Sequence, residues 1–144
     1  MLINARFHHL GLAVRNRKHA AAFLAGIGYR IGPEVFDPLQ NVRLTFCEND
    51  NGPAIEIIAP GEGSGAVDSI LRHTEALAYH TCYAVADSAE TARELQRAGM
   101  RVITISAGKP AILFPGQAVS FHQIPGFGLI ELVEPLLAHT GVSP

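Results

Sequence analysis

The chain is poor in cysteine. It has only two among 144 residues, Cys47 and Cys82, and two are too few for a disulfide framework. Each lies inside an apolar, strand-like run, where a reduced thiol usually behaves as a small core residue. The sequence therefore excludes a disulfide-stapled scaffold and favours a reducing compartment.

The chain also lacks an excess of positive charge and lacks a long apolar run. Its 11 Lys and Arg residues face 13 Asp and Glu residues, for a net charge of −2 at pH 7, and no Lys/Arg-rich run has the size of a nucleic-acid patch. Residues 1–9 show no basic segment leading into an apolar stretch, and no apolar run approaches the roughly 18 residues that span a bilayer. We therefore expect no nucleic-acid partner, no membrane segment and a cytoplasmic location.

What the chain does have is the composition of a globular protein. Hydrophobic residues make up 48% and charged residues 17%, and the 14 Gly and 9 Pro are spread along the sequence. A chain of this length can bury roughly two thirds of its unfolded surface. We therefore expect residues 1–144 to form a single domain.

One order of elements occurs twice, in a first copy at about 7–60 and a second at about 77–135, separated by a connector at about 61–76. Period-two apolar runs, helical spacing and Gly, Pro, Asn and Asp turns predict the elements. In the first copy they are a strand at 7–14, a helix at 19–28 and strands at 29–36, 42–47 and 53–58. In the second copy they are a strand at 77–85, a helix at 89–98 and strands at 101–106, 110–114, 118–123 and 129–133. The connector holds a glycine-rich turn and a short helix at 66–73.

The two copies align at their ends. Residues 9–14 match residues 80–85, so that His9 corresponds to His80, and residues 54–60 match residues 129–135, so that Glu56 corresponds to Glu131. His9 and Glu56 are 47 residues apart, and His80 and Glu131 are 51 residues apart. This difference of four residues between the two spacings can be accommodated by one longer loop. Each copy therefore carries one His in its first strand and one Glu in its last.

A buried carboxylate in a strand such as 54–58 needs a compensating partner, which can be an ion pair, hydrogen bonds or a metal. Alternation along a strand places His9 on one face with Gly11 and Ala13, opposite the bulky residues that a helix would cover. The same alternation applies to the other three residues. If the two sheets pair by pseudo-twofold symmetry, two His and two Glu converge as a mixed nitrogen and oxygen site for a divalent cation.

These residues resemble the vicinal oxygen chelate superfamily, which includes glyoxalases, bleomycin-resistance proteins and dioxygenases, and within it methylmalonyl-CoA epimerase-like proteins. The resemblance covers about residues 7–135. It rests on the His-initiated strand at 9–14, the Glu-Ile-Ile-Ala-Pro segment at 56–60, the short helix before His80, and the closing Gly-Leu-Ile-Glu-Leu-Val-Glu segment at 128–134.

The resemblance implies an α+β fold of two βαβββ modules that form a cupped, partly closed mixed β-sheet barrel. It implies a divalent metal, which could be Co, Mn, Ni, Zn or Mg, held by His9, Glu56, His80 and Glu131. The implied activity is that of an isomerase or epimerase working through a metal-stabilised enolate, with Glu131 as the catalytic base. The expected partners are a small-molecule substrate, such as the CoA thioester methylmalonyl-CoA, and a second copy of the chain in a homodimer.

The sequence departs from the epimerase pattern in its third strand. Some epimerases carry a second catalytic Glu there, whereas residues 42–47 contain no carboxylate. Cys82 and His122 could replace that base, or they could be a core thiol and an ordinary strand histidine. Arg43 could pair with a substrate carboxylate or phosphate.

Three other functions remain open at this stage. A lactoylglutathione lyase uses the same kind of ligands, although the Asp-Pro-Asp-Gly approach to its last strand is replaced here by Pro-Gly-Phe-Gly at 125–128. An extradiol-type dioxygenase would need iron and only one carboxylate, which leaves Glu56 in excess. A non-catalytic binding protein of this fold normally loses the ligands, and all four are present here.

Overall fold

The structure is a computed structural model that describes residues 2–137. The expected domain also includes residues 1 and 138–144, which lie outside the described residues. The strands are β1 (Ala5–Val14), β2 (Arg30–Asp37), β3 (Val42–Glu48), β4 (Ile55–Pro60), β5 (Ala76–Val85), β6 (Ile103–Pro110), β7 (Ala118–Ile124) and β8 (Gly128–Glu134). The helices are α1 (Arg17–Gly26), α2 (Asp68–Leu71) and α3 (Ser88–Arg97). None of these three helices is both long enough and apolar enough to cross a membrane.

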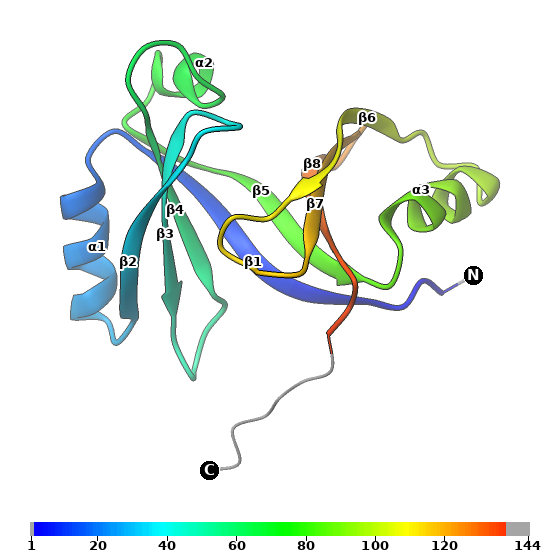
Figure 1. Ribbon diagram of the computed structural model, residues 1–144, viewed down its shortest axis with the longest axis horizontal. Coiled ribbons are helices and arrows are strands. Elements are labelled where there is room, and N and C mark those ends of the chain that lie inside the picture. Colours follow the sequence, from blue (N-terminus) through cyan, green and yellow to red (C-terminus); the bar gives the residue numbers. More distant parts are fainter. Residues whose placement is uncertain (1, 138–144) are drawn as a thin grey trace. The chain divides into compact units, whose positions relative to one another are not determined.

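The element order contains the βαβββ module twice, with α2 between the two copies (Figure 1). The hydrogen-bonded strand order is β2-β3-β4-β1-β5-β8-β7-β6, an open mixed sheet that ends at β2 and β6. The predicted α+β class and the two modules are therefore confirmed. The chain divides into two compact units, here called the N-terminal unit (residues 8–82) and the C-terminal unit (residues 2–7 and 83–137).

In the N-terminal unit, helix α1 covers one face of the strands. The side chain of Asn16 caps the helix by accepting a hydrogen bond from the backbone N–H of His19 at 3.1 Å. The helix contacts β2 and β4 and runs alongside β2 in Figure 1. Its buried Leu24 belongs to an apolar cluster that also contains Val14, Cys47, Ile57 and Ala59.

The strand register of this unit separates its two faces. Strand β1 runs parallel to β4 with Gly11 opposite Glu56, and β3 runs antiparallel to β4 with Phe46 opposite Glu56. Residues that pair in register share a face of the sheet. Gly11, Phe46 and Glu56 therefore share one face, and Ile57 with the α1 cluster occupies the other. This is the division of faces that strand alternation predicted.

The C-terminal unit repeats the arrangement. Helix α3 begins at an Asp87 cap, whose side chain accepts from the backbone N–H of Glu90 at 2.8 Å. Val85, Ile130 and Leu132 form its apolar cluster. Strand β8 pairs antiparallel with β7, and Glu131 lies opposite Phe121.

The prediction of separate strands at 101–106 and 110–114 was wrong. One strand, β6, runs from Ile103 through Gly108 to Pro110, and its pairing with β7 shifts register twice. The chain then turns, because the backbone N–H of Ala111 donates to Gln117 and that of Phe114 donates to Ala111. The residues after Pro110 thus close the hairpin between β6 and β7 and form no strand.

Candidate functional site

Three of the four predicted ligands lie in the N-terminal unit, where His9 is close to each of the other two. The Nε2 atom of His9 lies 3.8 Å from a carboxylate oxygen of Glu56 and 3.4 Å from Nε2 of His80. His9 is 0% exposed, His80 3% and Glu56 6%. The buried Nε2 atom of His9 therefore has a carboxylate oxygen and a second imidazole nitrogen as near neighbours.

Glycine at position 11 creates the space for this cluster. A Cβ atom added at Gly11 would lie 2.1 Å from Cε1 of His80 and 2.5 Å from its Nε2. No side chain tolerates such an overlap with a ring. Gly11 pairs with Glu56 in register, and its missing side chain lets the His80 imidazole lie across the backbone of β1.

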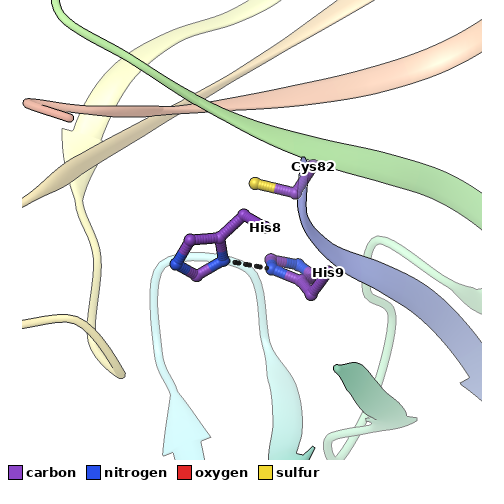
Figure 2. Close-up of side chains that lie close together, drawn as sticks. All are labelled: His8, His9 and Cys82. Carbon is purple, nitrogen blue, oxygen red and sulfur yellow. Dashed lines mark hydrogen bonds between the residues drawn. The ribbon is translucent and has the colours of Figure 1, made fainter. Parts of the chain in front are cut away.

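The other ring nitrogen of His9 has its own partner. Its Nδ1 lies 2.8 Å from Nδ1 of His8, as the dashed line in Figure 2 shows. When His9 carries its proton on Nδ1 and donates it to His8, the lone pair of Nε2 faces Glu56 and His80, which is the tautomer that a metal ligand needs. The Phe46 ring packs edge-on against His9 with 5.8 Å between ring centroids. His8 and Phe46 thus orient the imidazole.

The donor set of the N-terminal unit fits a divalent cation. Two neutral imidazoles and one carboxylate suit Zn²⁺ and the other transition metals that we expected. The Glu56 carboxylate is buried, which is costly without a compensating positive group. The cradle at Gly11, which a Cβ atom would fill, keeps the His80 ring beside these donors.

Glu131, the fourth predicted ligand, belongs to the C-terminal unit. It lies on β8 and is 3% exposed. Its neighbours Ile130 and Leu132 point into the apolar cluster, so the Glu131 side chain leaves the opposite face of the strand. Its membership of the metal site stays a prediction.

The suggested substrate contact of Arg43 is not supported by the structure. Arg43 pairs with Ala59, which belongs to the α1 cluster, and therefore lies on the face opposite Glu56. There its guanidinium group contacts Glu34 at 3.8 Å and the Phe36 ring at 5.7 Å. The sequence places Arg43 in the right strand, but the register turns it away from the cluster.

His122 is excluded as the second base for the same reason. It pairs with Ile130 on the core face of β8, opposite the face of Glu131. Its Nδ1 lies 3.0 Å from the Thr104 hydroxyl and its Nε2 lies 2.8 Å from the Ser120 hydroxyl. Burial lowers the pKa of His122 below its ordinary value, so the neutral ring is favoured. His122 is a hydrogen-bonded core residue of its unit.

Within residues 42–47, strand β3 supplies no base on the face of Glu56. Val42, Leu44 and Phe46 share this face and are apolar, and Glu48, which by alternation has the same side, lies at the exposed end of the strand. Thr45 lies on the α1 face, where its hydroxyl accepts a hydrogen bond from Arg17 at 2.7 Å. The missing carboxylate of the third strand is therefore not replaced within residues 42–47.

A basic pocket of about 990 Å³ at the start of α1 belongs to the other face as well. Its lining includes Leu12 and Val14, which pack with the α1 cluster. Of its basic residues, Arg17 pairs with Glu34 at 3.1 Å, and Arg15 donates to the backbone carbonyl of Leu71. This pocket is separated from the His9 cluster by the sheet.

Sequence reasoning missed the roles of His8 and Gly11. Neighbouring residues in a strand normally point to opposite faces, so His8 was assigned no role beside His9. Nδ1, however, is bonded to Cγ, the ring carbon attached to Cβ, and it can therefore stay near the backbone. From the sequence, Gly11 is only a small residue on the face of His9. The contrast with Cys82 at the matching position of the second copy could have indicated its role.

Comparison with known proteins agrees with this fold. The family model described as "Glyoxalase/Bleomycin resistance protein/Dioxygenase superfamily" matches residues 8–121. No curated protein matches the chain.

Several solved structures resemble it. A methylmalonyl-CoA epimerase from Mycobacterium tuberculosis has 22% identity and a TM-score of 0.76, with 94% of this chain and 93% of that chain covered. A hypothetical protein from Bacillus halodurans C-125 has 20% identity and a TM-score of 0.78, with 94% and 97% covered. A Streptomyces coelicolor methylmalonyl-CoA epimerase in complex with 2-nitronate-propionyl-CoA has 22% identity and a TM-score of 0.70, with 89% and 95% covered. At these identities the likeness establishes the fold.

Proposed function

Because this chain belongs to the glyoxalase/bleomycin resistance protein/dioxygenase superfamily, we propose that it is a divalent-metal-dependent isomerase or epimerase with His9, Glu56, His80 and Glu131 as its metal ligands. The observation that carries the proposal is the buried cluster of His9, Glu56 and His80 in the N-terminal unit. Nε2 of His9 lies near both other side chains, and Gly11 leaves room for the His80 ring.

In this proposal the metal, when bound, supplies a Lewis acid that polarises a carbonyl oxygen of the substrate. The protein supplies the rest. When Nδ1 of His9 carries the proton, its hydrogen bond with Nδ1 of His8 keeps Nε2 available and fixes the ring. Burial of His9 and Glu56 excludes water from these donors.

Glu131 is the proposed base. Its carboxylate would accept the proton from the carbon next to the carbonyl, which leaves a planar enolate, and return of a proton to the opposite face of that carbon would invert the centre. On the Glu56 face of β3, Val42, Leu44 and Phe46 carry no carboxylate, and Glu48 lies at the exposed end of the strand. We therefore propose a mechanism with one base, in which the enolate presents its other face to Glu131 before the proton is returned. With a single base, the proton taken from the substrate exchanges with solvent only when Glu131 is itself accessible between the two transfers.

The proposed substrates are 2-substituted acyl-CoA thioesters such as methylmalonyl-CoA. Support comes from the structural likeness to methylmalonyl-CoA epimerases of two bacteria, one of them in complex with 2-nitronate-propionyl-CoA. The same ligand chemistry would serve a lactoylglutathione lyase reaction, so the hemithioacetal of methylglyoxal and glutathione is the necessary second substrate in any test.

The test measures α-proton exchange in D₂O. Protein purified without chelator and analysed for metal would be incubated with racemic methylmalonyl-CoA and, separately, with the hemithioacetal, and deuterium incorporation followed by NMR. We expect exchange into the acyl-CoA that stops with chelator and returns with added metal. Glu131→Gln should lower the rate by about 100-fold or more, whereas Glu48→Gln, at the exposed end of β3, should leave it unchanged.

Absence of both deuterium exchange and interconversion of a single methylmalonyl-CoA epimer with metal-loaded protein would remove the epimerase proposal. Turnover of the hemithioacetal alone would replace it with the lyase.

A further inference from the structure

A second cluster of ligand-type side chains adjoins the first. One ligand atom from each of His8, His9 and Cys82 lies within 4.8 Å of the others, and Figure 2 shows the three side chains gathered between β1 and β5. His9 and Cys82 are 0% exposed, whereas His8 is partly exposed. All three residues belong to the N-terminal unit.

We propose that His8, His9 and Cys82 form a separate binding site for a thiophilic divalent cation such as Zn²⁺ or Cd²⁺. Two imidazoles and one thiolate are the donors that such ions prefer, whereas Mg²⁺ and Mn²⁺ prefer oxygen. A site with three protein ligands keeps one tetrahedral position for water or an external ligand. The inference does not rest on the proposed function, because His8 and Cys82 are outside that ligand set.

The distances are compatible with tetrahedral coordination. Metal–nitrogen bonds of about 2.0–2.1 Å and a metal–sulfur bond of about 2.3 Å place the two nitrogens roughly 3.4 Å apart and the sulfur roughly 3.6 Å from each. The Nδ1 atoms of His8 and His9 are now 2.8 Å apart, so they would separate by roughly 0.6 Å as the cation replaces the shared proton. Binding also displaces the Cys82 thiol proton to solvent as the sulfur–metal bond forms.

His9 links this site to the first. Its Nδ1 faces His8, while its Nε2 faces Glu56 and His80. A neutral imidazole offers one lone pair at a time. A cation bound through Nδ1 would therefore move the ring proton to Nε2, and the two sites should compete. A thiophilic ion is then expected to displace an oxygen-preferring one without replacing its function.

The experiment is a Cd²⁺ titration followed by thiolate-to-metal charge-transfer absorption in the ultraviolet. This region is favourable because the chain has no Trp. We expect a band that saturates at one equivalent, is lost in Cys82→Ser, and persists in Cys47→Ser, the matched control for the other buried thiol. His8→Asn should weaken Cd²⁺ binding by about tenfold or more. Thermal melts of each variant would establish that it is folded.

Glu56→Gln separates this inference from the proposed function. It should weaken Mn²⁺ binding and leave the Cd²⁺ band in place. No band in the wild-type protein at excess Cd²⁺, or a band that survives in folded Cys82→Ser, would overturn the inference, whether or not the protein turns over any substrate.

Discussion

The first strands of the two copies, β1 and β5, are alike in burial and different in chemistry. Both are ten residues long with the same burial class at every position, and His9 and His80 occupy the same buried place in each. Their neighbours differ, because His8 corresponds to Tyr79 and Gly11 corresponds to Cys82. The repeated fold places the two histidines at equivalent positions. The differences at His8/Tyr79 and Gly11/Cys82 determine which groups surround each imidazole.

The inner strands show the same relation. Phe46 pairs with Glu56 in the first copy and Phe121 pairs with Glu131 in the second, so Cys47 and His122 occupy equivalent core positions. Burial raises the pKa of the Cys47 thiol and lowers the pKa of the His122 imidazole. Both shifts favour the neutral form, because both groups belong to the helix-covered core.

The largest effect is expected from giving position 11 a side chain, as the matching position of β5 has in Cys82. Gly11→Ala places a methyl group 2.1 Å from Cε1 of His80, so His80 must leave the cluster. We expect Mn²⁺ affinity to fall by about 100-fold or more, and the free energy of unfolding to fall by about 1–3 kcal/mol. Calorimetric titration and denaturation measure the two quantities.

The control is Gly26→Ala, because a Cβ atom there meets nothing within 4 Å. It should leave the affinity unchanged and raise the free energy of unfolding by up to about 1 kcal/mol, because Ala favours a helix more than Gly does. If Gly11→Ala binds Mn²⁺ as tightly as the wild type, the cradle described here has no role.

The next largest effect is expected from removing the negative charge of Glu56 in the last strand of the first copy. Glu56→Gln keeps the shape of the side chain and removes the charged oxygen 3.8 Å from Nε2 of His9. The affinity for Mn²⁺ should fall by about 10–100-fold, measured by electron paramagnetic resonance of the free ion. Glu48→Gln should match the wild type, and equal losses in both variants would mean that Glu56 acts only through net charge.

A smaller effect is expected from replacing His8, which contacts the ring of His9. His8→Asn weakens the acceptor for Nδ1 of His9, so Mn²⁺ affinity should fall by about tenfold while the ligands stay in place. Tyr79→Phe, at the corresponding position of β5, keeps its ring and should have no such effect. A loss in Tyr79→Phe of the same size would show that ring packing, and not the His8 hydrogen bond, orients the imidazoles.

The smallest effect concerns stability and pH. Because burial lowers the pKa of His122 below the ordinary 6.5, the unfolded chain binds more protons there than the folded one, and stability is lost as the pH falls below that value. His122→Gln should reduce the drop in melting temperature between about pH 7.5 and about pH 5. Exposed His73→Gln should keep the full drop, and an unchanged drop in His122→Gln would contradict the assignment.

Much of the site could be predicted because strands have a strict period of two. That period, with the repeat, predicted which face His9 and Glu56 share, and the register confirmed it. Chain proximity was a poor guide for Arg43 and His122, because a shift of one residue along a strand moves a side chain to the other face.

Two features could not be predicted from alternation. The contact of His8 with His9 depends on a ring nitrogen close to the backbone, and the role of Gly11 depends on a side chain from another strand. The loop after Pro110 was misassigned because a short apolar run between turn residues fits a strand and a hairpin loop equally well.

The most direct test of the central account is a crystal structure of the protein grown with Mn²⁺, with the anomalous signal of the metal located in the map. The account predicts one strong peak within bonding distance of Nε2 of His9, Nε2 of His80 and the carboxylate of Glu56, with Glu131 as the fourth ligand. A fully occupied peak elsewhere, or no peak beside His9 at saturating Mn²⁺, would contradict it.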